Sequence, residues 1–584
     1  MTAAPDSLSL HDHALAGDAQ RHAIECLLNC YLREYALPRG EACLDARGQD
    51  LPMSLRQLAG TRVCIDLAGG RLAVAADRTS VLGRCRFTSA PYFKGNGQGW
   101  RPLGVMELAQ LLLAPLASAE RHGELMGQIH NSLSVTRVFL RHAVPAQQLP
   151  QDSLLRSEQH QVWGHALHPT PKSREGVSLE SLLACSPEVG ARFSLHWFQV
   201  DPSLFRHLGD DPRATLRQLS GEEHLYPCHP WEVQRILGNP LVQRAMSRGL
   251  MAYRGALGAP LYPTSSVRTL YHPELAYFLK FSVHVRLTNC IRKNAWYELH
   301  SAVALTRLLR PAMADLARHQ PGFELMPEPA ASTLDLSALG SAEQAREVTE
   351  CFGILYRGNF DAGSREAYRP QVAMALFTWG LDGHGMCASR LRQCAARLGL
   401  GREETAALWL QRYAGLLLGG VLHCLYRQGV VLEPHLQNTL LGFDDDGLPC
   451  RVWVRDLEGT KLVAGHWPEE RLAGLDERTR ASLYYSPEKA WKRVAYCALV
   501  NNLGEALFHL ADGDAALERR LWTLLGEELR AQCARLGNPA ELSGLCAGAA
   551  LPSKENFMTR LLQRADREAG YTALPNPLFH GDRA

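Results

Sequence analysis

Hydrophobic positions recur with helical spacing in two segments near the start of the chain, residues 15–35 and 105–142, and strong helix formers fill both. Between them, residues 62–87 contain short alternating runs, RVCIDLA and RLAVAA, which predict a small sheet. Residues 190–300 are richer in strand patterns, such as ARFSLHWFQV and KFSVHVRLTNCIR, with prolines and glycines between them. From residue 341 onward helical patterns dominate again. The pattern therefore predicts helices at both ends of the chain and strands in its middle.

One segment of the helical C-terminal part, about residues 430–463, follows a different pattern. An amphipathic helix over 404–428 is expected to end at Gly429, a residue type common just after helix ends. The short apolar run VVL leads into the polar stretch EPHLQN. Two strands follow, TLLGF and CRVWVRD, joined by a turn that contains Asp446 and Gly447. Because the second strand ends in RDLEG, its polar groups are expected to converge with those of EPHLQN.

The length of 584 residues is too great for one hydrophobic core and indicates roughly three or four domain-sized units. Stretches rich in Pro, Gln and Ser at 145–151 and 326–339 are the expected boundaries. We therefore divide the chain into residues 1–150, mostly helical with a small sheet, 151–335, with antiparallel strands, and 336–584, mostly helical with the inserted hairpin.

Composition excludes several classes of protein. Apolar residues make up 46% and charged residues 21%, and the formal net charge is only +2, so the charge balance does not favour nucleic acid or an anionic membrane as a partner. The N-terminus lacks the pattern of a secretory signal, and the apolar runs are shorter than a bilayer span. The 16 cysteines are scattered without a CxxC pair. We expect a reduced, cytoplasmic protein without nucleic-acid or membrane partners.

The common signatures of nucleotide-binding proteins and hydrolases are absent. The chain has no GxxxxGK[ST] loop, no HExxH and no GxSxG, and the glycines at 95–99 lack the strand-to-helix context of a dinucleotide fingerprint. The run FDDDG at 443–447 is interpreted as a hairpin turn, because Arg455 stands where a calcium loop needs a bidentate Glu.

Three segments concentrate groups that suit anions. The first, GHALHPTPKSREG at 164–176, carries cationic groups in a proline-stiffened loop, and the second, PTSSVRT at 263–269, combines hydroxyls with an Arg. In the third, residues 280–293, strand alternation predicts that Lys280 and Arg286 share one face. Alone, each has an ordinary interpretation as a solvated turn or edge strand. The succession of the second and third favours a shared polyanion pocket.

A fourth group lies in the insert. Glu433, His435, Gln437 and Asn438 precede one strand, and Asp456 ends its partner. Carboxylate and amide oxygens on facing strand ends are hard ligands that suit Mg²⁺. The layout is that of a kinase-like metal site, so this group predicts a magnesium-nucleotide site.

With these residues in view, the chain resembles the aerobactin-synthetase (IucA/IucC) family of NRPS-independent siderophore synthetases. The resemblance rests on GHALHPTPKSREG, YPCHPWE, YPTSSVRTL, KFSVHVRLTNCIR, EPHLQNTLLGF and VRDLEG, in the family's order, over about residues 164–459. Two positions depart from it: Ala follows His165, and Glu232 follows HPW, where the family often has Pro and Gln.

The resemblance implies an α+β fold of three parts arranged like a hand, with a thumb at 1–150, fingers at 151–335 and a kinase-like palm at 336–584, in a homodimer. It also implies that ATP and Mg²⁺ serve to adenylate a carboxylate of citrate, a citrate derivative or 2-oxoglutarate. An amine or hydroxyl would then displace AMP, which gives an amide or ester.

The resemblance further assigns roles to individual residues. Phosphate contacts to ATP are implied for Ser266, Arg268, Thr269, Lys280 and Arg292. Carboxylate-substrate contacts are implied for His168, Thr288, Arg292, His435, Arg493 and Tyr496. The last two are expected on one helix, which the N-cap residue Ser486 and Pro487 begin. Contacts to magnesium and the adenylate are implied for Glu433, Gln437 and Asp456. For catalysis, Arg292 and Lys280 would offset anionic charge, and either His435 or His168 would accept the nucleophile's proton.

Two alternatives stay open on the residues themselves. A small-molecule kinase would use the insert alone for phosphoryl transfer to a hydroxyl. A non-catalytic protein that binds citrate or a ferric siderophore would have no need of Glu433 and Asp456, which disfavours that alternative.

Overall fold

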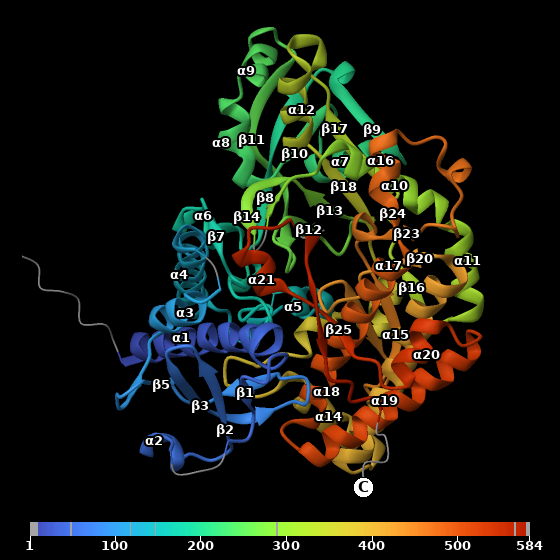
Figure 1. Cartoon of the computed structure of the whole chain (residues 1–584). Coiled ribbons are helices and arrows are strands. Elements are labelled where there is room, and N and C mark those ends of the chain that lie inside the picture. Colours follow the sequence, from blue (N-terminus) through green and yellow to red (C-terminus); the bar gives the residue numbers. More distant parts are fainter. Residues whose placement is uncertain are drawn as a thin grey trace, which may run out of the picture.

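The computed structural model describes residues 10–46, 50–116, 118–145, 148–159, 161–287, 290–565 and 568–579. Figure 1 shows an N-terminal region at the lower left, a sheet-rich middle region at the top and a mostly helical C-terminal region at the lower right. The chain is a mixed helix and sheet protein, as the hydrophobic pattern predicts.

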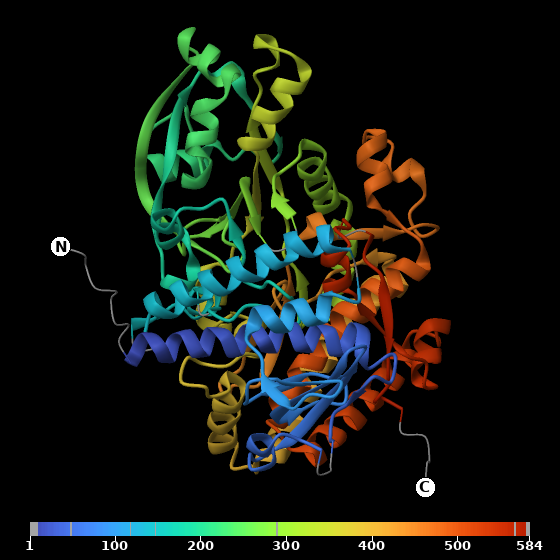
Figure 2. The ribbon, with the colours of Figure 1, turned by 60° about the vertical axis from the view of Figure 1, so that its left-hand side comes forward.

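The N-terminal region packs helices on a six-stranded antiparallel sheet. Helix α1 continues into a π-helical turn over Leu32–Ala36, and Leu28, Val74 and Phe139 are buried in the shared core. The long blue helix α1 in Figure 2 runs beneath α3 and α4. The helices are α1 (Leu10–Tyr31), α2 (Met53–Arg56), α3 (Val105–Leu113) and α4 (Ala119–His142). The strands are β1 (Ala42–Cys43), β2 (Thr61–Leu67), β3 (Gly70–Thr79), β4 (Cys85–Phe87), β5 (Tyr92–Gly95) and β6 (Trp100–Pro102).

The middle region is built on an eight-stranded sheet. In order across the sheet, its strands are β10 (Leu225–Cys228), β8 (Phe193–Val200), β11 (Met251–Pro263), β12 (Thr269–Tyr271), β13 (Tyr277–Phe281), β18 (Ile354–Gly358), β17 (Ala330–Leu334) and β9 (Phe205–Gly209). The boundary expected near residue 335 falls inside this sheet, because β18 pairs with both β13 and β17. Its residues Ile354, Leu355 and Tyr356 are fully buried, which explains why this later segment joins the sheet.

The segment 280–288 does not form one continuous strand, so the predicted shared face of Lys280 and Arg286 is wrong. Lys280 lies in β13, whereas Arg286 lies in β14 (Val283–Leu287), which pairs with β7 (Arg174–Glu175) and β15 (Cys290–Arg292) in a separate sheet. The break is at Ser282, whose Oγ accepts the amide N–H of Asn294 at 2.6 Å. Arg286 instead pairs with Glu124 of α4 at 2.8 Å.

The C-terminal region contains the predicted hairpin. Strands β21 (Thr439–Phe443) and β22 (Pro449–Val454) are antiparallel, and a four-stranded sheet is completed by β16 (Phe323–Leu325) and β19 (Gln371–Val372). Helix α15 (Arg402–Gln428) packs against this sheet and ends at Gly429, whose φ of +65° confirms the expected C-cap. A smaller sheet is formed by β20 (Val430–Val431), β23 (Lys461–Val463) and β24 (Tyr484–Tyr485).

The remaining helices cover the middle sheet and surround α15. Residues 496–503 form a π-helical turn between α17 and α18. Within the ranges that the structure describes, no helix is long and apolar enough to cross a membrane. These helices are α5 (Ser153–Gln159), α6 (Leu179–Cys185), α7 (Arg213–Ser220), α8 (Val233–Gly238), α9 (Pro240–Ser247), α10 (Trp296–Leu308), α11 (Arg310–His319), α12 (Ala342–Cys351), α13 (Ala362–Tyr368), α14 (Met386–Leu398), α16 (Glu477–Leu483), α17 (Pro487–Ala495), α18 (Gly504–Ala511), α19 (Ala515–Arg535), α20 (Ala540–Cys546) and α21 (Asn556–Leu561).

The last part of the chain returns to the N-terminal region. Strands β25 (Leu551–Lys554) and β26 (Tyr571–Leu574) form a hairpin, and α21 lies between them in the sequence. Phe557 and Leu561 of α21 are fully buried in the N-terminal core. Helix α21 therefore shares one core with the N-terminal region. Its red ribbon lies beside the blue ribbon of that region in both views (Figures 1 and 2).

Candidate active site

The candidate site centres on Asp456, just after β22. The residue has φ +80°, a left-handed conformation that Asp tolerates better than most residues. Its carboxylate accepts hydrogen bonds from Lys280 Nζ at 2.6 Å and Arg357 Nη2 at 2.8 Å. Glu458 accepts from the same Lys280 ammonium at 2.7 Å. The end of the β21–β22 hairpin thus meets strand β13 of the middle sheet through charged groups.

Burial and charge act in opposite directions on these carboxyl groups. Burial alone would raise the pKa of Asp456, but Lys280 and Arg357 hold that pKa well below its usual range. Burial also opposes ionisation of Glu458, and Lys280 and Arg268 lower its pKa. Burial raises the pKa of Glu328, which Arg357 offsets only in part. Asp456 and Glu458 are therefore charged at neutral pH, as ligands for a cation must be.

The loop that joins β11 to β12 lies next to this cluster. Val267 has φ +67°, a strained conformation for a β-branched residue, and such strain is concentrated at functional sites. The Arg268 guanidinium donates to Asn294 Oδ1 at 2.6 Å and lies 3.9 Å from Glu458. Thr269 donates its amide N–H to Ser266 Oγ at 3.3 Å. The loop therefore holds Ser266, Arg268 and Thr269 close together, as predicted for a phosphate-binding segment.

Glu158 of α5, which the sequence analysis missed, connects this loop to Arg455 at the end of the β21–β22 hairpin. Its Oε2 accepts from the amide N–H of Ser265 at 3.0 Å and from Ser265 Oγ at 2.7 Å, and its carboxylate pairs with Arg455. Arg455 donates to the carbonyl of Gln437 at 3.0 Å, and Gln437 Nε2 approaches Ser265 Oγ at 3.4 Å. A Glu within a short helix gives no local signal of such a role.

The loop after β20 carries Glu433 and His435. Glu433 forms an ion pair with Arg493 of α17, and Arg493 Nη2 also donates to Tyr485 Oη at 3.0 Å. Burial lowers the pKa of His435, so its imidazole is neutral near pH 7. Helix α17 begins after the predicted cap Ser486, whose side chain accepts from the amide N–H of Lys489.

Two asparagines of the π-helical turn hold this loop, and the sequence analysis missed both. Asn501 Oδ1 accepts the amide N–H of Leu436 at 3.1 Å, and Asn502 Nδ2 donates to the carbonyl of Pro434 at 2.8 Å. Asn501 Nδ2 also lies 2.7 Å from His165 Nε2. The loop of residues 164–176 therefore meets the EPHLQN loop at Asn501.

His168 lies in the same loop and is buried. Its Nδ1 accepts the amide N–H of Thr170 at 3.1 Å, which leaves Nε2 to carry the proton of the neutral ring. Burial, followed by the charges of His168 and His435, lowers the pKa of His165 to about 3. Three histidines thus gather where the two loops meet.

The other cations of the 164–176 loop stabilise the fold instead. Lys172 Nζ lies 2.7 Å from Glu188 and Arg174 lies 3.2 Å from the same carboxylate, and all three side chains are buried. Because a buried charge needs a partner, the two cations share the carboxylate of Glu188.

Three further residues were predicted to contact the substrates: Arg292, Tyr496 and Thr288. Arg292 ends β15, and its carbonyl accepts from Arg268 Nη1 at 3.3 Å. Tyr496 is buried, and its hydroxyl lies 3.1 Å from Asn556 Nδ2, which also donates to the carbonyl of Leu167. Thr288 lies outside the described residues.

Lys461 is a further residue that the sequence analysis did not single out. Its pKa is lowered by burial, against the opposing charges of Glu433 and Glu458. Its Nζ donates to the carbonyl of Glu458 at 3.3 Å. The ammonium group is thus influenced by both Glu433 and Glu458. The position of Lys461, directly after the motif VRDLEGT, could have indicated this residue from the sequence.

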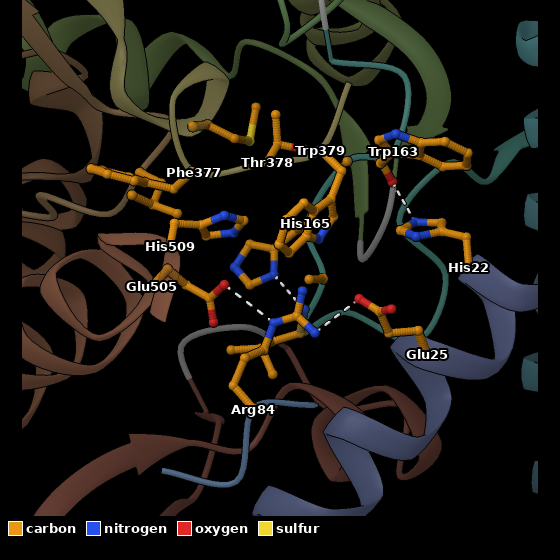
Figure 3. A pocket seen from close by; sticks show the side chains of 15 residues that line it. His22, Glu25, Arg84, Trp163, His165, Phe377, Thr378, Trp379, Glu505 and His509 are labelled. Atoms are coloured by element: carbon orange, nitrogen blue, oxygen red, sulfur yellow. Dashed lines mark hydrogen bonds and ion pairs between the residues drawn. The ribbon is translucent and has the colours of Figure 1, made fainter. Parts of the chain in front are cut away.

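A small enclosed cavity next to the site is not the place where substrate binds. Figure 3 shows that its walls come from α1, the 163–167 loop and α18, with Arg84 between two carboxylates. Arg84 pairs with Glu25 at 2.9 Å and with Glu505 at 3.3 Å. The cavity volume is about 30 Å³, far below the roughly 300 Å³ of a small-molecule site. This pocket is a charge-balanced junction between the N-terminal and C-terminal regions.

Comparison with known proteins finds similar sequences among siderophore biosynthesis proteins and citrate ligases. Residues 153–378 match the model of the IucA / IucC family, and residues 407–569 match a model described as ferric iron reductase FhuF-like transporter. A rhizobactin siderophore biosynthesis protein, RhbC, from Rhizobium meliloti is 26% identical over 97% of this chain and 99% of its own length. An L-2,3-diaminopropanoate–citrate ligase from Staphylococcus aureus is 28% identical over 82% of this chain and 83% of its own.

Solved structures show the same fold. The ATP-bound aerobactin synthetase IucA from Klebsiella pneumoniae superposes with a TM-score of 0.80 at 21% identity, over 95% of this chain and 99% of that one. The petrobactin biosynthesis protein AsbB from Bacillus anthracis gives a TM-score of 0.76 at 16% identity, over 98% of each chain. The sequence motifs, the family model over residues 153–378 and the relatives that span nearly the whole chain agree, and the chain is similar to the IucA/IucC family.

Proposed function

We propose that this chain is an ATP-dependent ligase of siderophore biosynthesis that adenylates a carboxylate of citrate or a citrate derivative and transfers the acyl group to an amine or hydroxyl. The relatives include named citrate ligases, and a structural relative is described as ATP-bound. The observation that carries the proposal is the contact of Lys280 in β13 with the carboxylates of Asp456 and Glu458 after β22.

Two substrate regions follow from this arrangement. Lys280, Arg268 and the hydroxyls of the 264–269 loop would bind phosphate oxygens, since they combine cations with hydrogen-bond donors. The carboxylate substrate would lie toward His168, His435 and Arg493. Arg292 would contact it from β15, and the contact implied for Thr288 remains a prediction.

The reaction requires two anions to meet. A carboxylate oxygen attacks the α-phosphorus of ATP, and the bond to pyrophosphate breaks. The amine or hydroxyl then attacks the acyl carbon, AMP leaves, and the nucleophile loses a proton. Cations at the site offset the repulsion in the first step and stabilise the leaving pyrophosphate. Neutral His435 would accept the proton in the second step, because the Nδ1 lone pair of His168, the alternative base, already accepts the amide N–H of Thr170.

The donor set suits a magnesium ion. Asp456, Glu458 and Glu433 supply charged oxygens, and Mg²⁺ would neutralise the triphosphate. Among the described residues these carboxylates do not form a compact ligand group. Instead they pair with Lys280, Arg357 and Arg493. A metal ion that arrives with the nucleotide would replace some of these cations as the partner of the carboxylates.

We further propose a hand-like arrangement, with residues 1–150 as the thumb, 151–335 as the fingers and 336–584 as the palm, of which β18 joins the sheet of the fingers. Contacts between the parts support the arrangement, because His165 of the fingers meets Asn501 of the palm and Arg84 of the thumb pairs with Glu505 of the palm. A cytoplasmic homodimer belongs to the same proposal. Gel filtration with light scattering would test the dimer.

The test distinguishes which phosphorus is attacked. Purified protein with ATP, Mg²⁺ and citrate should release pyrophosphate, and hydroxylamine should trap the activated acid as a hydroxamate. Citrate, a citrate monoamide and 2-oxoglutarate, assayed in parallel with a panel of amines, would identify the acid. Stoichiometric ADP without AMP or pyrophosphate, with all three acids, would show a kinase instead.

A further inference from the structure

Helices α11 and α15 bring two histidines and an aspartate together outside the candidate active site. Asp315 and His319 are four residues apart on α11 and therefore share a face. His423 approaches from α15, with Nε2 at 2.7 Å from Asp315 Oδ2. His319 Nδ1 lies 3.0 Å from the other carboxylate oxygen, Oδ1.

The three potential ligand atoms are close enough to share one ion. They all lie within 4.8 Å of one another, and the two imidazole rings are stacked at 22° with centroids 5.7 Å apart. Nitrogen and oxygen ligands bound at about 2.0–2.2 Å to a tetrahedral ion lie roughly 3.5 Å apart. The spacing that one ion requires therefore falls within the range that these three side chains span, from 2.7 to 4.8 Å.

The surroundings fix two of the ligands and leave the third accessible. Gln428 Nε2 donates to Asp315 Oδ2 at 3.1 Å and to the carbonyl of Ala312 at 3.0 Å, which holds the carboxylate against both helices. The side chain of His423 is 13% exposed, whereas that of His319 is 58% exposed. An ion could therefore enter from solvent onto a partly preformed pair.

We propose that Asp315, His319 and His423 form a site for a divalent transition-metal ion such as Zn²⁺ or Ni²⁺, with water completing the coordination. Two imidazole nitrogens and one carboxylate suit this class of ion, whereas Mg²⁺ and Ca²⁺ prefer sets made only of oxygen. The site is therefore chemically different from the magnesium site proposed near Asp456.

Such an ion would join the two elements that lead into the active site. Helix α11 runs into β16, which pairs in parallel with β22 up to Val454, two residues before Asp456. Helix α15 leads through Gly429 toward Glu433. Because the ion would bind the folded arrangement and not the unfolded chain, it would raise the thermal midpoint.

The experiment compares Ni²⁺ binding to the full chain and to single variants after treatment with a chelator. Isothermal titration should find one more Ni²⁺ in the wild type than in His423→Asn. His319→Ala, at an exposed position, should weaken that site by about 10-fold or more. The thermal midpoint should rise with Ni²⁺ in the wild type and not in either variant.

The matched control is His142→Ala, which removes an exposed histidine at the end of α4. This variant should bind Ni²⁺ as the wild type does, and sites formed by cysteines elsewhere cancel in the comparison. Equal stoichiometry and equal midpoint shifts in the wild type, His319→Ala and His423→Asn would overturn the proposal.

Discussion

Asp456 shows how one residue links the two halves of the candidate site. Its left-handed conformation turns the chain sharply after β22, and its carboxylate receives Lys280 from the middle sheet and Arg357 from β18. Both cations keep other partners, because Lys280 also contacts Glu458 and Arg357 contacts Glu328. Removal of the charge at Asp456 therefore leaves no cation without a carboxylate.

Asp456→Asn should consequently fold and fail in catalysis. Asn tolerates the left-handed region nearly as well as Asp, so the turn is retained. Loss of a charge at the reacting centre should reduce pyrophosphate release by about 10²-fold or more and raise the Mg²⁺ concentration required. Asp446→Asn, in the exposed turn of the same hairpin, is the control and should behave as the wild type. An inactive Asp446→Asn with an active Asp456→Asn would place the metal in the turn.

Residues with a local pattern could be predicted, and those that act at a distance could not. Asp456 and Glu433 flank a recognisable hairpin, and Ser266 and Arg268 stand in a recognisable turn. Glu158 and Asn501 lie in ordinary helical sequence, where nothing local indicates that they fix the loops of the site. Arg493 was accessible only through the resemblance to the family.

The same distinction holds for whole elements. The hairpin of β21 and β22, the end of α15 at Gly429 and the start of α17 after Ser486 follow from turn and cap residues, and all three were predicted. The break at Ser282 was not predicted, because it depends on Asn294, which follows a neighbouring strand. Similarly, β18 joins the middle sheet through long-range pairing that its own sequence does not reveal.

Close contact between α15 and β16 requires glycine at one position. A Cβ on Gly420 would overlap the buried ring of Phe323, whereas a Cβ on Gly415 of the same helix would have no neighbour within 4 Å. Gly420→Ala should therefore lower the free energy of unfolding by roughly 1–3 kcal/mol. Gly415→Ala should leave it unchanged or raise it by about 0.5–1 kcal/mol, through helix propensity. Chemical denaturation of both variants provides the measurement, and equal effects would show that this contact is not tight.

At the scale of the whole molecule, the C-terminal segment closes the structure onto the N-terminal region at Glu34. Its two carboxylate oxygens accept the amide N–H groups of Phe557 and Met558, at 2.9 and 3.0 Å. The adjacent Asn556 contacts both Tyr496 and the loop that carries His168. Docking of α21 therefore supports the carboxylate region of the proposed site.

This contact should make stability depend on pH. Burial raises the pKa of Glu34 from its ordinary value near 4.5 to about 8, despite the hydrogen bonds from Phe557 and Met558 that favour the charged form. At pH values between these two pKa values, the carboxyl group of Glu34 is protonated to a greater extent in the folded chain than in the unfolded chain. The contribution of Glu34 to the free energy of unfolding is therefore fully present at low pH. It falls as the pH rises toward 8, by at most about 1.4 kcal/mol per pH unit. Glu34→Gln removes the titration, so the difference in thermal midpoint between wild type and variant should shrink from pH 6 to pH 8.5. Parallel midpoint curves across that range would show that Glu34 is charged in the folded chain and that its docking contact does not titrate.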